Sequence, residues 1–306
     1  MRLPPLALLL LPALLLLLRP SSATIHDGRP ALRPVPLVVT IAANASAAEC
    51  FAAEELARYL RTITNGSSST AVLLVNATSA AAAAPQLAVG YGAARLLGVP
   101  AGQLQGLGRE GYVLSPALRG ASLALSGGLG APRGTLYAVN EFLEAIGVQF
   151  LAADVTVLPK RLPPQLPVLP PRYVPRLEYR QTYGFQLIGA PDFNTHLRLN
   201  KGHFNDPAPE LDAAHGGVYP VYAAPPGDAH TSYALLPGGL NRGLEGPPPE
   251  LFKSHRGWFW PQEDNASGVY GQLCWSNRSL QDFLVKRVKG FLRSQPGEKT
   301  VFLSDF

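Results

Sequence analysis

A dense run of prolines sets the strongest limit on how this 306-residue chain can fold. Seven prolines lie between residues 159 and 175. Proline has no backbone N–H and disrupts the interior of a helix, so such a tract favours an extended linker. The sequence therefore predicts a first domain over residues 30–160, a linker over 161–175 and a second domain over 176–306.

The first domain alternates between strand-like and helix-like segments. Short apolar runs, β-branched or alternating in polarity, predict strands at residues 36–42, 72–75, 86–90, 111–115 and 122–126. Apolar residues at helical spacing predict helices at residues 47–61, 92–97 and 133–146, the last closed by Gly147. This order predicts an α/β fold in which two long helices cover one face of a small mixed sheet.

The second domain has fewer regular segments. We expect strands at residues 176–183 and 300–303, a short helix at 192–200 capped by Asp192, and a helix at 280–292 capped by Ser279. A strand–loop–helix–strand order with long loops is typical of the start of a (β/α)₈ barrel. A whole barrel takes about 250 residues, whereas 131 residues run from Arg176 to Phe306. We therefore expect an incomplete barrel and a chain that is inactive by itself.

The N-terminus has the three parts of a secretory signal peptide. Met1 and Arg2 precede a leucine-rich run over residues 6–18, and small residues at 21–23 precede Thr24. The alternative, a membrane anchor, is disfavoured because the run is short for the roughly 20 residues that span a bilayer. We expect residues 1–23 to be removed and the mature protein to be secreted or in the secretory lumen, without a membrane span.

Five N-x-[ST] sequons accompany this leader, and together they predict N-glycosylation. They begin at Asn44, Asn65, Asn76, Asn265 and Asn277. The two cysteines, Cys50 and Cys274, can pair in an oxidising compartment, but they lie in different predicted domains. Two separate thiols packed as small apolar side chains are therefore the preferred interpretation.

Charge and motifs exclude several function classes. The chain has 26 Lys and Arg against 21 Asp and Glu, and loss of Arg2 and Arg19 with the leader leaves 24 against 21. A net charge of +3, spread along the chain, is too weak for a nucleic-acid interface. The glycines of residues 127–130 lack the spacing of a phosphate-binding loop and predict a hairpin turn. Without a Cys/His cluster or a dinucleotide fingerprint, we expect no metal and no cofactor.

The first domain resembles a known module. The R-G-T-L-Y-A start and the apolar helix over residues 133–147 are similar to the N-terminal module of glycoside hydrolase family 67, the α-glucuronidases. The A-E-E-L-A-R-Y-L helix over 53–60 and the G-Y-V-L strand over 111–114 fit the same module, so the resemblance covers most of residues 36–158. It implies a small α/β domain of the type found as the second domain of β-hexosaminidase-like enzymes.

Residues 176–306 resemble an uncharacterised barrel-like domain that often follows this module. The similar features are His230 before Leu236 and Pro237, His-x-x-Trp-Phe over 255–259, Q-L-C-W-S-N over 272–277 and the final Ser304–Asp305 step. Related sequences have Pro-Glu after the second histidine, where this chain has Arg256 and Gly257. The resemblance implies a link to carbohydrate and an oligosaccharide or polysaccharide partner.

Glycoside hydrolysis uses two carboxyl groups facing each other across the scissile bond. In barrels these groups lie at the C-terminal ends of strands. Asp305 is the carboxylate predicted at such a position, and position and resemblance make it the candidate catalytic residue. The alternative is a loop or capping aspartate, and no partner carboxylate is identified.

The candidate substrate-binding residues are His230, His255, Trp258, Trp260 and Asn277. Imidazole can both donate to and accept from sugar hydroxyls, and tryptophan planes can stack on sugar faces. The alternatives are exposed loop histidines, tryptophans in the core, and an Asn277 that caps a helix. The sequence thus predicts a secreted carbohydrate-active protein, part of an α-glucuronidase-like glycoside hydrolase. A non-catalytic carbohydrate-binding or extracellular adaptor protein is the alternative.

Overall fold

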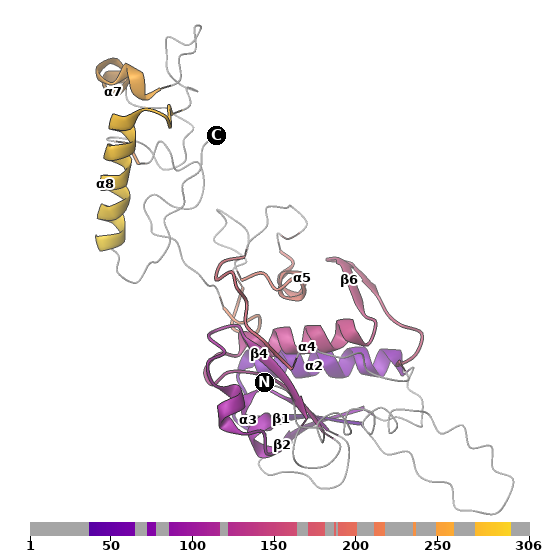
Figure 1. Ribbon diagram of the computed structural model, residues 1–306. Helices are drawn as coiled ribbons and strands as arrows, with labels where there is room; N and C mark the ends of the chain where they lie inside the picture. Colours follow the sequence, from indigo (N-terminus) through magenta and orange to yellow (C-terminus); the bar gives the residue numbers. More distant parts are fainter. Residues whose placement is uncertain are drawn as a thin grey trace, which may run out of the picture. The chain divides into compact units, whose positions relative to one another are not determined.

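The structure is a computed structural model in which the chain forms two compact units (Figure 1). The first comprises residues 1–202 and 209–217, and the second 203–208 and 218–306. The structure describes residues 37–64, 72–77, 86–116, 122–163, 171–180, 187, 189–200, 211–217, 235–236, 249–259 and 273–294. The predicted leader, Asn65, His230, Trp260, Asn265, the strand at 300–303 and Asp305 lie outside the described residues.

A mixed sheet forms the centre of the first unit, in the order β2-β1-β3-β5-β4-β8. Its strands are β1 (Leu37–Ala42), β2 (Val72–Ala77), β3 (Gln86–Val89), β4 (Tyr112–Pro116), β5 (Leu123–Gly127) and β8 (Arg172–Tyr173). The pairs β1–β2, β1–β3 and β3–β5 are parallel, and β4 runs antiparallel to both β5 and β8. The prediction of a mixed α/β fold is confirmed, and the strands predicted at 111–115 and 122–126 form and pair with each other.

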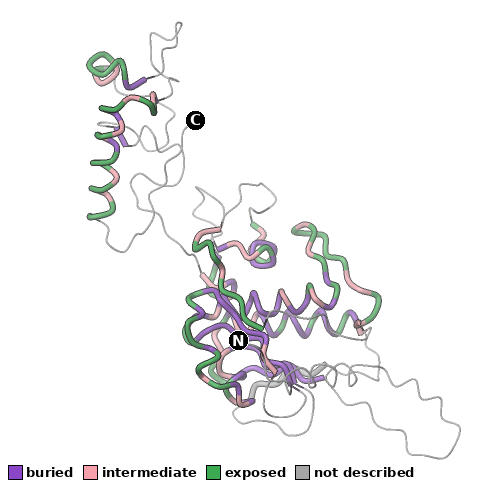
Figure 2. The backbone as a smooth tube through the Cα atoms, in the orientation of Figure 1, coloured by how far each residue is buried: buried purple, intermediate pink, exposed green. Residues whose placement is uncertain are grey.

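Both faces of this sheet are covered by helices. The long helices α2 (Ala47–Ile63) and α4 (Arg133–Ala145) lie on one face, where Leu87, Val89 and Leu125 join their core (Figure 1). The short helix α3 (Tyr91–Leu96) and the 3₁₀ turn η1 (Ala101–Leu104) cover the other face, where Ala88 and Ala124 point. Strands β1, β3 and β5 are buried throughout, as expected for parallel strands covered on both sides (Figure 2).

Close contacts at the start of α4 explain why its second and third residues are Gly and Thr. A Cβ on Gly134 would lie 2.1 Å from the Gly111 carbonyl oxygen and 3.0 Å from the Gly127 Cα, so only glycine fits there. Thr135 Oγ1 accepts a hydrogen bond from the Gly127 backbone N–H at 2.9 Å. These contacts hold the N-terminus of α4 against the start of β4 and the end of β5.

A second, two-stranded sheet follows α4. Gly147, at φ 103°, ends the helix as predicted and leads into β6 (Gln149–Ala152), which pairs antiparallel with β7 (Val155–Val157). Phe150 packs edge-on to Tyr59 of α2 and stacks on His196, with ring centroids 5.7 Å and 3.7 Å apart. This hairpin therefore forms a wall beside α2.

The first unit continues well beyond residue 160. Strand β8 adds to the sheet within the proline-rich tract, and Arg172 donates to the carbonyls of Gln103, Gln105 and Gly106. Residues 176–180, expected to begin a strand, form none. The Arg180 backbone N–H instead donates to the Asn200 side chain at 2.9 Å, so it does not bond to a neighbouring strand.

The short helix predicted at 192–200 forms as α5 (Pro191–His196). Its N-cap is Ala190 without a side-chain cap, so the expected capping role of Asp192 is wrong. Asp192 lies in the first helical turn and pairs with His215 instead. The helix ends early because Arg198 adopts the left-handed conformation, at φ 57°.

The described part of the second unit contains α7 (Pro249–Ser254), the 3₁₀ turn η3 (Arg256–Trp258) and α8 (Arg278–Ser294). Seven buried residues form its core: Leu235, Leu236, Trp258, Phe259, Leu273, Leu280 and Leu284. The helix predicted at 280–292 is confirmed, but it begins two residues earlier, so Ser279 lies inside the first turn rather than at the cap.

Cys50 and Cys274 are both free thiols, and burial raises the pKa of Cys50, with Glu54 and Glu49 adding to the shift. No helix within the described ranges is long and apolar enough to cross a bilayer.

We expect Gly134→Ala to destabilise the first unit by about 3 kcal/mol, because the added methyl group overpacks a backbone contact. Calorimetric melting of the whole chain would measure the shift. Gly102→Ala is the matched control, because nothing lies within 4 Å of its added Cβ. Equal melting temperatures for the two variants would contradict the close-approach explanation.

Candidate functional site

Three of the predicted site residues lie together in the second unit. The His255 and Trp258 rings are 4.2 Å apart between centroids, and Asn277 Nδ2 donates to the Gly257 carbonyl at 2.9 Å. The backbone completes the cluster, because the Cys274 N–H donates to the Trp258 carbonyl at 2.7 Å. The segments 255–259 and 273–280, separated in sequence, thus form one local structure.

Trp258 is part of the core in this cluster. Its side chain packs between His255 and Phe283, and the residue is 7% exposed. Its indole N–H donates to Ser279 Oγ at 2.7 Å. The structure thus favours the core interpretation for Trp258, while His255 and Trp275 are exposed, Trp275 to 40%.

Asn277 caps helix α8. Its Oδ1 accepts from the Leu280 N–H at 3.1 Å, the position three residues into the helix, and from Ser279 Oγ at 2.9 Å. Because Nδ2 already contacts Gly257, a glycan at this sequon would compete with that contact. Asn44 has no such conflict, since it is exposed in the turn after β1.

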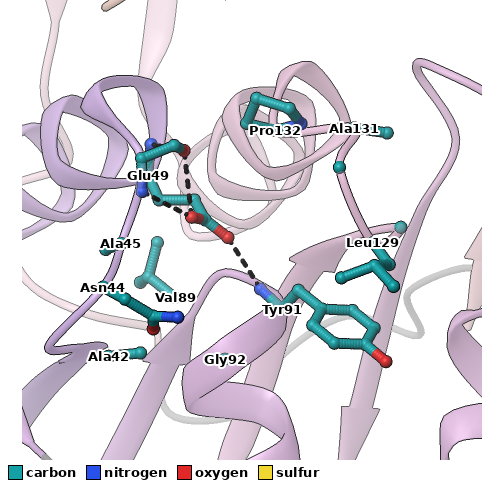
Figure 3. A pocket seen from close by; sticks show the side chains of 13 residues that line it. Ala42, Asn44, Ala45, Glu49, Val89, Tyr91, Gly92, Leu129, Ala131 and Pro132 are labelled. Atoms are coloured by element: carbon teal, nitrogen blue, oxygen red, sulfur yellow. Dashed lines mark hydrogen bonds between the residues drawn. The ribbon is translucent and has the colours of Figure 1, made fainter.

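A crevice lies in the first unit at the C-terminal ends of β1, β3 and β5 (Figure 3). Its volume is about 230 Å³, and its lining includes Asn44, Glu49 and Tyr91. Open α/β sheets commonly bind ligands at this edge, where helix N-termini favour anions. Position alone makes this crevice a candidate.

The Glu49 carboxylate occupies the anion position of the crevice (Figure 3). Oε2 accepts from the Ser46 N–H and hydroxyl at 2.8 and 2.9 Å, and Oε1 accepts from the Tyr91 N–H at 2.8 Å. A Cβ on Gly90 would lie 2.4 Å from Glu49 Oε1, so glycine leaves room for this carboxylate. Glu49 therefore already accepts the backbone donors of Ser46 and Tyr91 at the starts of α2 and α3, and a phosphate would have to displace it.

A larger cavity, of about 400 Å³, lies between α2, the β6–β7 hairpin and α5. Its lining includes Arg58, Tyr59, Asp154, Asp192 and His196. Sequence reasoning missed this site because its residues come from three distant segments. Patterns of local spacing do not show which segments meet.

Two buried carboxylates hold the segment that carries α5 in place. Glu55, 3% exposed, accepts from His196 Nε2 at 2.8 Å and from Arg58 at 3.2 Å. Glu110, 6% exposed, lies between Arg133 and Arg180 at 3.3 and 2.7 Å. The Arg133 pair is close in distance but lacks hydrogen-bond alignment, so Glu110 Oε1 has an ionic partner and no hydrogen-bond donor.

Residues 211–217 complete this arrangement. His215 Nδ1 lies 2.7 Å from Asp212 and Nε2 lies 2.8 Å from Asp192, while the ring packs against Phe51. The hydrogen bond from His215 lowers the pKa of Asp212. Arg133 also reaches this segment through the Gly216 carbonyl, at 3.0 Å.

Among the residues that the structure describes, no group of three or more His, Cys, Asp or Glu side chains is placed to hold a metal ion. No protein-family model matches the sequence, and no curated protein matches it significantly.

We expect Asn277→Ala to destabilise the second unit by about 1 kcal/mol, because it removes the helix cap. Asn277→Ser is the matched control, because serine also caps and both changes remove the sequon. All three tryptophans lie in the second unit, so urea unfolding followed by tryptophan fluorescence reports on it selectively. A serine variant no more stable than the alanine variant would argue against the capping role.

We expect Glu110→Gln to destabilise the first unit by about 3–5 kcal/mol, because it leaves Arg133, with a 5% exposed side chain, without a counter-charge. Glu54→Gln, at an exposed position of α2, should change stability by less than about 0.5 kcal/mol. Chemical denaturation followed by circular dichroism measures both. Similar small losses in both variants would show that the Glu110 network is not needed for folding.

Proposed function

We propose that this chain is a secreted carbohydrate-active protein and part of an α-glucuronidase-like glycoside hydrolase that cleaves O-glycosyl bonds in polysaccharide. The observation that carries the proposal is the fit of the R-G-T-x-Y segment to its surroundings. Arg133 pairs with Glu110, Gly134 meets the Gly111 carbonyl, and Thr135 binds Gly127. The residues on which the resemblance rests therefore have contacts that depend on their chemical type.

The same segment also holds the chain that follows the module. Tyr137 Oη donates to the Leu199 carbonyl at 3.3 Å, and Asn140 Nδ2 donates to the Thr195 carbonyl at 2.8 Å. An N-terminal module that fixes the start of the next segment suits an enzyme in which catalysis belongs to the following domain. In this proposal residues 176–306 open a (β/α)₈ barrel, with Asp305 as a catalytic carboxylate.

Secretion and glycosylation belong to the same proposal. The leucine-rich leader supports export, and the exposed side of the turn that carries Asn44 suits a glycan at that sequon. An extracellular enzyme acting on polysaccharide meets its substrate outside the cell, which agrees with this route.

A non-catalytic carbohydrate-binding protein is the second candidate. The observation in its favour is the 40% exposure of Trp275, because an exposed indole can stack on a sugar face. This candidate needs binding without turnover.

The test uses the product of the full gene, including any sequence downstream of Phe306. We expect this protein to release sugar from glucuronoxylan or from 4-nitrophenyl glycosides. Asp305→Asn should lower kcat by about 10²–10⁴-fold if the carboxyl group transfers a proton. Asp282→Asn, at an exposed position of α8, is the control and should leave kcat unchanged.

The outcomes separate the two candidates. Binding on a glycan array without hydrolysis would replace the hydrolase by the binding protein. Neither binding nor hydrolysis by the full gene product would overturn both.

A further inference from the structure

We propose that the cavity between α2, the β6–β7 hairpin and α5 binds a neutral sugar residue, separately from any catalytic centre in the second unit. Carbohydrate as the ligand class rests on the proposed function, whereas the place and the charge preference come from the cavity itself. Its volume of about 400 Å³ lies within the usual range for ligand clefts, about 300–1,000 Å³.

Buried contacts fix the walls of the cavity before any ligand arrives. His196 of α5 is 6% exposed and bonds Glu55 of α2 at 2.8 Å. Phe150 of the hairpin stacks on the same imidazole at 3.7 Å and meets Tyr59 edge-on. One residue, His196, thus contacts both other walls of the cavity. Because the cleft is preformed, little conformational entropy is lost when a ligand binds.

The lining combines an apolar floor with hydrogen-bonding groups. Tyr59 and Phe193, 6% and 8% exposed, contribute the apolar part, and Asp154, Thr156 and Asp192 contribute exposed oxygens. A sugar ring offers the complement, because it carries C–H faces and several hydroxyl donors. Ionised carboxylates only accept hydrogen bonds, so they select a ligand rich in donors.

The charges of the cavity disfavour an acidic ligand. The Arg58 guanidinium lies 3.2 Å from Glu55 and 4.3 Å from the Tyr59 ring, so its nearest carboxylate partner already belongs to the wall. His215 contacts Asp192, but no cation contact is seen for Asp154 within the described ranges. A uronic acid would bring a further carboxylate toward Asp154 and Asp192, and like charges repel.

The test measures binding of neutral xylo- and gluco-oligosaccharides to the whole chain by saturation-transfer NMR and calorimetry. We expect a Kd on the order of 1 mM, typical of a few hydrogen bonds to one sugar residue. Ala153→Trp should abolish binding by filling the cavity, and Asp154→Ala should weaken it at least about fivefold, the loss of one hydrogen bond. Both positions are exposed, so neither change should lower the melting temperature.

Glu54→Ala is the matched control, since it changes an exposed carboxylate of the same helix α2 outside the cavity lining. Binding that survives Ala153→Trp, or no binding to the unaltered chain, would overturn the site. Tighter binding of glucuronic acid than of neutral sugars would overturn the charge preference. Absence of hydrolysis by the full gene product would leave these results standing, so the two proposals fail separately.

Discussion

The Glu110 carboxylate, buried between two arginines, is the interaction on which the arrangement of the first unit depends. Arg133 comes from the start of α4 and Arg180 from the segment after the proline-rich tract. Asn200 Nδ2 adds a third contact to the same carboxylate at 3.1 Å. A buried charge is costly unless it is paired, so these elements must come together in one geometry.

This geometry places the segment that carries α5 against α4 and α2. Once that segment is fixed, His196 can reach Glu55 and His215 can reach Asp192. The cavity between α2, the β6–β7 hairpin and α5 exists only because these pairs form. The proline-rich tract is therefore more than a spacer at its C-terminal end, where β8 joins the sheet.

The crevice at Glu49 and the cavity beside α5 differ in what they offer a ligand. The crevice at the ends of the parallel strands is occupied by Glu49, whose carboxylate accepts the donors that a bound anion would use. The cavity beside α5 keeps exposed oxygens on Asp154 and Asp192. Ligand chemistry thus follows from which hydrogen-bonding groups the fold has already satisfied.

The sequence alone predicted the two long helices and the strands β1 to β5 of the first domain, because their apolar residues recur at regular spacing, but it did not predict the β6–β7 hairpin. Helix α4 and its end at Gly147 are examples. It also predicted helix α8, but it named Ser279 as the cap, whereas Asn277 caps the helix. Only the tertiary structure decided the roles of Glu55, Glu110 and His196, because pairs such as Glu55 and His196 are 141 residues apart. Such contacts produce no periodic pattern in the sequence. They determine how these segments pack because the charged groups are buried.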